Sequence, residues 1–396
     1  MARIDALPFA EFDFAHEHLG ATMDLHVQLA RWREQSPMWE VQLFGQPAVL
    51  LLSYEVVSAA FKDEQNLPGR TIHLGGSAMA LGNFVSTYEG SEHRIRRAIL
   101  SPPFRRSVIP TYLELMRQVA HELIDEFAAD GHAELVSQFT HRYPLRIITR
   151  LLELPSTDDA RTAKLAGDLI RYDFDPEGAL EAKAWFVEMV TPLIEARRSK
   201  PGDDLISVVI HSEFEGERLD DEDCQSFVRH LFPAAADTTL LGMGNLLSAL
   251  LTQPELMAAA RERPEVRTTM VEEAMRFDAP VANLPRKSPE DRAVDWRGVH
   301  LEPGTFMIHS IQSANRDPAV YSDPDRFMPD RKFAAAPLTF GFGTHLCVGN
   351  HLALAEIRTG LDALLERLPD IALAEGTDAK VGGTILRGPA QLEVTF

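Results

Sequence analysis

This sequence of 396 residues has very little cysteine and an unbalanced charge. Its two cysteines, Cys224 and Cys347, cannot build the disulfide framework of a secreted protein. Lysine and arginine number 39 against 59 aspartate and glutamate residues, which gives a formal net charge of −20. So strong a negative charge argues against nucleic acid or an anionic membrane as a partner.

The chain also lacks an obvious targeting segment and a long uninterrupted apolar run. Its first residues, Met1–Pro8, contain no apolar core of a signal peptide. The most apolar stretch, residues 231–251, is interrupted by Asp237 and Asn245 and therefore predicts a buried helix and no membrane span. These features predict a cytoplasmic protein, which we expect to be a monomer.

Helical periodicity dominates what is present, and short strand-like runs accompany it. No internal repeat or low-complexity linker is visible, so we expect one domain over residues 1–396, mostly α with small β-sheets. The expected helices cover residues 24–32, 113–127, 145–152, 182–190, 220–251 and 268–277. The expected strands cover residues 39–43, 48–53, 305–309 and 391–396.

The segment around Cys347 carries the most chemistry. Glycines open the loop that holds this cysteine, and a helix is predicted directly after it, from about residue 350 to residue 368. A helix amino terminus near a sulfur favours thiolate over thiol. A lone cysteine is more often a small buried hydrophobe, but this setting suits a cysteine that ligates haem iron.

The flanking residues, Phe-Gly-x-Gly-x-His-x-Cys-x-Gly over positions 340–349, resemble the haem-binding loop of the cytochrome P-450 family. That resemblance implies the fold of the family, a triangular helical prism that encloses haem b. It implies that Cys347 ligates the iron and that Phe340, Gly341 and Gly349 contact the haem.

The predicted helix over residues 220–251 contains Ala-Ala-Ala-Asp-Thr-Thr at positions 234–239. An acid and a hydroxyl in an apolar helix are costly unless they are used or paired, and a threonine there can bond the carbonyl one turn back. The run resembles the dioxygen-activating signature of the family. By that resemblance, Asp237 and Thr238 deliver protons during dioxygen activation.

Two residues of this helix depart from the family pattern. Ala235 stands where the family usually has glycine and adds a methyl group beside the dioxygen site. Pro233 lacks an N–H and frees the Arg229 carbonyl, so we expect a bend or a widened turn.

The resemblance also assigns charged residues to two roles. Four basic residues match positions that bind haem propionates, whose charge requires cationic partners: His93, Arg97, Arg286 and His345. Three others match a buried triad that stabilises the core: Glu273, Arg276 and Arg326.

A cluster of arginines stands out in this acidic chain: Arg94, Arg96, Arg97, Arg105 and Arg106. In the family, this helix borders the face where electrons enter. Charge complementarity then predicts an acidic redox partner, a ferredoxin served by its own reductase.

The segments that match substrate-contacting segments of the family are small, apolar or weakly polar, which predicts a small-to-medium hydrophobic substrate such as a terpenoid, steroid or aromatic compound. His73 and Asn283 are the polar anchors that the sequence offers. The residues assigned to this pocket are Phe84, Ala235, Val281, Asn283 and Ile385.

The resemblance therefore implies a bacterial haem-thiolate monooxygenase that inserts one atom of dioxygen into its substrate. One alternative is a peroxide-driven haem-thiolate oxidase, although such relatives usually lack the acid–alcohol pair that this chain keeps. A non-catalytic haem sensor or ligand-binding protein is a second alternative, against which no output domain is visible.

Overall fold

The computed structural model describes residues 2–15, 24–74, 76–155 and 159–396. Helices predominate, as predicted, and the described residues form two compact units. Unit 1 comprises the described residues of Met1–Ile72, Leu241–Cys347 and Ala372–Glu393, and unit 2 comprises those of His73–Leu240, Val348–Ile371 and Val394–Phe396. The expectation of a single domain stays a prediction.

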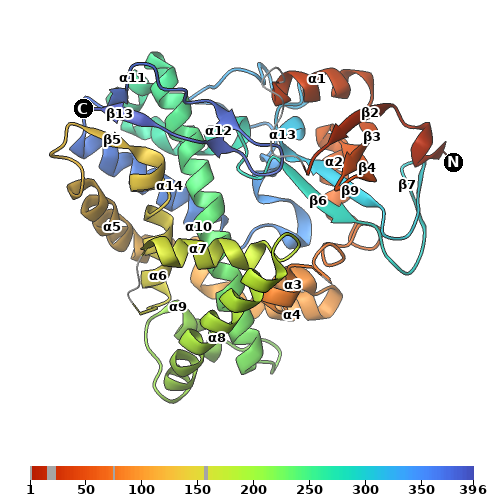
Figure 1. Ribbon diagram of the computed structural model, residues 1–396, viewed down its shortest axis with the longest axis horizontal. Coiled ribbons are helices and arrows are strands. Elements are labelled where there is room, and N and C mark those ends of the chain that lie inside the picture. The colour runs from red at the N-terminus through yellow and green to blue at the C-terminus, as the bar shows by residue number, and fades with distance from the viewer. Residues whose placement is uncertain (1, 16–23, 75, 156–158) are drawn as a thin grey trace. The chain divides into compact units, whose positions relative to one another are not determined.

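Unit 1 is built on a five-stranded mixed sheet with the order β2-β3-β4-β9-β6 (Figure 1). The β3/β4 and β6/β9 pairs are antiparallel, while β2/β3 and β4/β9 are parallel. Along β3, buried and partly exposed side chains alternate, as expected for a strand with one face on the core. The strands are β2 (Phe9–Asp13), β3 (Met38–Leu43), β4 (Gln46–Leu51), β6 (Asn283–Lys287) and β9 (Phe306–Ser310).

The sequence predicted β3, β4 and β9 but missed β6. Pro285 lies within β6, and a proline argues against a central strand because it donates no ladder hydrogen bond. Strand β6 is the edge of the sheet, where a proline is tolerated.

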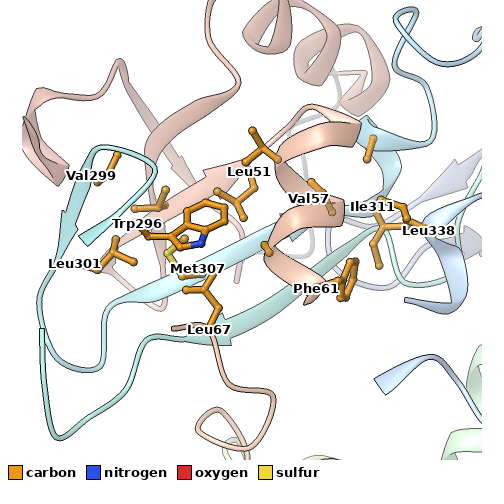
Figure 2. Close-up of a cluster of buried hydrophobic side chains, with 14 of the residues drawn as sticks. Leu51, Val57, Phe61, Leu67, Trp296, Val299, Leu301, Met307, Ile311 and Leu338 are labelled. Carbon is orange, nitrogen blue, oxygen red and sulfur yellow. The ribbon is translucent and has the colours of Figure 1, made fainter. Parts of the chain in front are cut away.

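Helix α2 (Tyr54–Lys62) covers one face of this sheet and closes an apolar core (Figure 2). Val57 and Phe61 of α2 pack in one cluster with Met307 of β9. A hairpin of β7 (Val294–Trp296) and β8 (Val299–Leu301) adds Trp296 to the cluster. This core fixes the β6–β9 ladder from which Arg286 projects.

The remaining elements of unit 1 are short helices and strands. The helices are α1 (Leu25–Gln35), α11 (Pro254–Glu262), α12 (Arg267–Phe277) and α13 (Ile311–Ala314). The strands are β1 (Ala2–Arg3), β10 (Ala372–Leu373), β11 (Val381–Gly382) and β12 (Gly388–Pro389), and β13 (Glu393–Thr395) runs from unit 1 into unit 2.

Unit 2 is helical apart from the short strand β5 (His132–Glu134) and the end of β13. Helix α14 packs along α5 and α7 packs along α8. The apolar stripe predicted for α5 is confirmed, since Met116, Val119 and Leu123 are fully buried. The helices are α3 (Ala78–Leu81), α4 (Gly90–Leu100), α5 (Leu113–Asp125), α6 (Tyr143–Leu151), α7 (Asp159–Ile170), α8 (Pro176–Ser199), α9 (Leu205–His211) and α14 (Asn350–Arg367).

The long helix α10 (Asp221–Thr252) begins in unit 2 and ends in unit 1. Its predicted extent is confirmed, and it continues through Pro233, so the expected bend there stays a prediction. By length and composition α10 is the one candidate membrane span among the described residues, but 61% of its most apolar window is buried. That degree of burial is typical of a core helix in a soluble fold.

Candidate functional site

The loop that carries Cys347 lies in unit 1, between two short 3₁₀ turns and the start of α14. Gly341 and Gly343 have φ values of 74° and 76°, a left-handed conformation that glycine adopts without strain. A Cβ atom at position 343 would lie 3.1 Å from the carbonyl oxygen of Phe61. The Cys347 N–H donates to the Phe340 carbonyl at 2.8 Å, so the loop is closed by its own backbone, and Cys347 is exposed.

The two cysteines have opposite environments. Cys224, in α10, is 2% exposed, and burial raises the pKa of its thiol to about 12. Such a thiol is inert and serves as a small hydrophobe. Cys347, in contrast, is exposed.

The second notable group of unit 1 is Arg286, in β6. Within the described ranges, its guanidinium makes no hydrogen bond or ion pair, and burial lowers its pKa to about 10. His309 follows Met307, the cross-strand partner of Arg286, by two residues, so both side chains share one face of the sheet. His309 is 1% exposed and neither ring nitrogen has a partner.

Arg286 is partly exposed, and an arginine that loses part of its hydration without gaining an anion benefits from a ligand that supplies the missing charge. This unneutralised arginine therefore fits a carboxylate that the protein itself does not provide, which agrees with the propionate role predicted for Arg286. Arg286 would hold a haem propionate and Cys347 would hold the iron.

Unit 1 also contains Phe340, Gly341 and His345 of the predicted cofactor residues. The Nε2 atom of His345 lies 3.1 Å from an oxygen of Glu64. Unit 2 contains Gly349 and the two basic residues of α4, His93 and Arg97. His93 is 4% exposed, and burial together with the neighbouring Arg97 lowers the pKa of its imidazole.

The acid–alcohol pair lies in the unit 2 part of α10. Thr238 Oγ1 donates to the Ala234 carbonyl at 2.9 Å, which confirms the predicted bond one turn back. Desolvation raises the pKa of Asp237 above its ordinary value, although His141 and Arg171 oppose the shift. A carboxyl with a raised pKa can take up and release a proton nearer neutral pH than an ordinary aspartate.

The buried ion-pair network corrects one prediction. Glu273 and Arg276, both 0% exposed, bond through two contacts of 2.7 and 2.8 Å. The third side chain is Arg331, whose Nε lies 2.8 and 2.9 Å from the two Glu273 oxygens. The assignment of Arg326 is wrong, because its side chain is exposed and only its carbonyl accepts, from Arg276 and Arg331.

The motif match assigned Arg326, but Arg331 follows the same Asp-Pro turn. Arg331 is 5% exposed and also donates to the carbonyls of Ser322 and Asp323. The fold of this turn, which residue types alone do not specify, decides which arginine points inward.

The predicted substrate residues fall into two groups. In unit 1, Val281 bridges to Leu386, and the Ala282 N–H donates to the Ile385 carbonyl at 2.8 Å, so Val281, Asn283 and Ile385 come together. Asn283 is fully buried and donates its amide to the Thr384 carbonyl at 2.6 Å, while its Oδ1 atom has no hydrogen-bond partner among the described residues, so its pocket role stays a prediction. Phe84 and Ala235 lie in unit 2.

The basic cluster is partly neutralised. Arg94 makes a bidentate pair with Glu215 at 2.6 and 2.7 Å, and Arg96 lies 3.1 Å from Asp223. Arg105 and Arg106 are exposed and have no ion pair within the part of the chain that the structure describes. They are the cluster members best able to meet an acidic partner.

Comparison with known proteins gives consistent matches. The family model for cytochrome P-450 matches residues 14–154 and 177–378. The chain is 31% identical over 364 residues to mycinamicin IV hydroxylase/epoxidase of Micromonospora griseorubida, covering 89% of this chain and 90% of that protein. It is 29% identical over 394 residues to 6-deoxyerythronolide B hydroxylase of Saccharopolyspora erythraea, covering 94% and 96%.

Solved structures agree. The polyketide synthase cytochrome P-450 PksS of Bacillus subtilis matches with a TM-score of 0.85 and 26% identity, covering 93% of this chain and 96% of that one. A mutant of the mixed-function enzyme MycG in complex with mycinamicin IV matches with a TM-score of 0.82 and 28% identity, covering 98% and 100%. The chain belongs to the cytochrome P-450 family, has its mostly helical fold, and is a monooxygenase.

Proposed function

We propose that this enzyme is a haem-thiolate monooxygenase that hydroxylates a hydrophobic secondary metabolite of the macrolide or polyketide type. It takes electrons from a separate ferredoxin and reductase. One oxygen atom enters a C–H bond of the substrate and the other leaves as water, which consumes electrons from the partner and protons from solvent. The observation that carries this proposal is the closed, glycine-shaped loop that presents an exposed Cys347.

Haem b, when bound, supplies the iron at which dioxygen is activated. Cys347 holds that iron through its thiolate, and the bond between its N–H and Phe340 fixes the loop. Arg286 neutralises a propionate from β6, and His345, His93 and Arg97 are its proposed co-partners. Phe340, Gly341 and Gly349 line the haem in this assignment.

Asp237 and Thr238 move the protons. Asp237 carries a carboxyl with a raised pKa and can pass a proton from solvent along α10. Thr238 donates its hydroxyl proton to the Ala234 carbonyl. Its hydroxyl oxygen can therefore accept a hydrogen bond from a proton donor.

The redox partner is proposed to be an acidic ferredoxin. Arg105 and Arg106 are exposed and unpaired within the described ranges, and they project from a chain of net charge −20. An isolated basic patch on an acidic protein steers an acidic partner to one face.

The substrate class is taken from the relatives. The named hydroxylases of mycinamicin IV and 6-deoxyerythronolide B cover most of this chain at 31% and 29% identity. This extends the sequence-based expectation of a terpenoid, steroid or aromatic compound to larger oxygenated rings. Phe84, Ala235, Val281 and Ile385 remain the proposed apolar contacts.

Thr238→Ala tests the proton role and separates the dioxygen reaction from a peroxide-driven one. With dioxygen and electrons, we expect product per electron pair to fall roughly 10²-fold, while turnover with added hydrogen peroxide survives. Thr252→Ala is the matched control, because Thr252 is in the same helix and also donates one turn back, to Ser248 at 2.7 Å. Equal product yields from the Thr238→Ala variant and the wild type under dioxygen would contradict the proton role.

A further inference from the structure

Three aromatic rings of unit 2 pack together where α10 meets the segment before α4. The imidazole of His230 stacks on Phe84 with a centroid distance of 4.0 Å and an interplanar angle of 10°. His73 meets the same phenyl ring edge-on, at 4.9 Å and 71°. Phe84 is 4% exposed, so it is a fixed platform that sets the orientation of the His230 ring.

The imidazole of His230 has polar capacity that the protein does not use. Across the described residues, no hydrogen bond or ion pair reaches its ring nitrogens, whereas His73 bonds Ser77 Oγ at 3.1 Å. His230 is only partly buried. Its ring nitrogens are accessible to solvent, whereas both ring nitrogens of His309 are sealed from solvent and have no partner. A small molecule can therefore reach them.

The surroundings of His230 keep the ring neutral. Its helical neighbours Phe227 and Leu231 are both 7% exposed. Desolvation lowers the pKa of His230 to about 4. A neutral imidazole has one donor nitrogen and one acceptor nitrogen, and it therefore suits a hydroxyl or a carbonyl better than a charged group.

The position of His230 in α10 links it to the proposed chemistry. His230, Ala234 and Thr238 follow one another at intervals of four residues and lie along one side of the helix. Eight residues of helix correspond to ~12 Å. A molecule that reaches both His230 and the neighbourhood of Thr238 must span a distance of this order, which exceeds a single small ring.

We propose that His230, held by Phe84, hydrogen-bonds a neutral hydroxyl or carbonyl oxygen of the substrate and thereby selects which part of it approaches Thr238. This inference rests on the proposed function and sharpens it, because it requires an oxygenated, elongated or large-ring hydrophobic substrate. It also adds a polar anchor that the sequence did not indicate.

The test compares two rigid tetracyclic probes, androstanone and androstane, which differ in one carbonyl oxygen. Binding of each is measured by optical titration of the ferric haem band in the intact holoenzyme. We expect the wild type to bind androstanone about tenfold more tightly than androstane, in line with one hydrogen bond. His230→Phe, which can keep the ring stack, should abolish this preference and leave the affinity for androstane unchanged.

Two further variants exclude a merely structural role. His230→Gln restores a donor and an acceptor and should recover part of the preference. His73→Phe tests the anchor that the sequence offered instead: it should retain the preference, because His73 already bonds Ser77 Oγ, and a preference lost in His73→Phe and kept in His230→Phe would assign the anchor to His73. The inference is overturned if His230→Phe keeps the preference, or if the wild type binds androstanone no more tightly than androstane or binds neither. Failure of the proposed function would be visible earlier, as a wild-type protein without a thiolate-ligated haem spectrum before any probe is added.

Discussion

Arg276 and Arg286 lie in the same unit, ten residues apart in sequence, yet their surroundings are opposite. Arg276 is 0% exposed and donates to both oxygens of Glu273 and to the carbonyls of Asn315, Pro324 and Arg326. Arg286 makes no such bond within the described residues, although burial lowers its pKa to about 10.

This difference distinguishes a residue that stabilises the fold, Arg276, from a residue that we propose binds a ligand, Arg286. A buried charge whose donors are all used stabilises the fold only as part of its network. A partly desolvated charge without a partner, as at Arg286, costs free energy that a bound ligand can recover. The cysteines repeat the contrast, since Cys224 is buried among apolar groups and Cys347 is exposed on a closed loop. Groups that the fold leaves unsatisfied are the ones to examine for function.

Removing Arg331 disrupts the buried ion-pair network of Glu273 and Arg276, and it should have the largest effect on stability. Arg331→Met leaves Glu273 with one of its two arginine partners, and removal of one partner of a buried ion pair costs ~3–5 kcal/mol. We expect the free energy of unfolding, measured by urea titration of the holoenzyme, to fall by roughly that amount.

Arg326→Met is the matched control, because its exposed side chain lies outside the network, and surface substitutions usually change stability by less than ~0.5 kcal/mol. Equal losses of stability in the two variants would contradict the assignment of Arg331 as the third member.

Replacing Arg286 removes the guanidinium that has no protein partner in the described residues. The change should weaken haem binding without lowering the free energy of unfolding of the protein. A charge-assisted bond to a carboxylate contributes ~1.5–3 kcal/mol, so Arg286→Met should speed transfer of haem to an acceptor protein by roughly 10- to 100-fold. Because the arginine has no protein partner in the described ranges, the unfolding free energy of the haem-free protein should stay the same or rise. A destabilised haem-free protein with unchanged haem retention would contradict the proposal.

Reversing the charge of surface arginines should have the smallest effect. These variants extend the comparison between paired and unpaired arginines to the protein surface. Arg105→Glu with Arg106→Glu should slow reduction by an acidic ferredoxin by ~3- to 10-fold at low ionic strength and flatten its salt dependence. Arg94→Glu should change reduction less, because Glu215 already neutralises Arg94. Lys164→Glu on α7 matches Arg94→Glu in net charge, and stopped-flow reduction rates that are the same in all variants would exclude this docking face.

The sequence predicted the local elements well and the long-range partners less well. The extents of α10 and α14 follow from their periodicity, and the back-bond of Thr238 follows from its place in an apolar helix. Strand β6 was not predicted, because Pro285 argues against a strand and the sequence does not show that this segment lies at the edge of the sheet.

Other features depend on three-dimensional packing that no local pattern encodes. Arg331 replaces Arg326 because the turn after the Asp-Pro segment directs one arginine inward and the other outward. The stack of His230 on Phe84 joins residues 146 positions apart, so neither residue signals the other in the sequence. Asn283 donates its amide to the Thr384 carbonyl, a contact between residues 101 positions apart that the sequence does not signal.

The most direct test of the central claim is the carbon monoxide spectrum of the reduced protein in Cys347→Ser and Cys224→Ser variants. The wild type and Cys224→Ser should show the Soret band of a thiolate-ligated haem, because Cys224 is buried with a pKa of about 12. Cys347→Ser should lose that band and with it dioxygen-driven turnover. A thiolate band that survives in Cys347→Ser would contradict the assignment of Cys347 as the iron ligand.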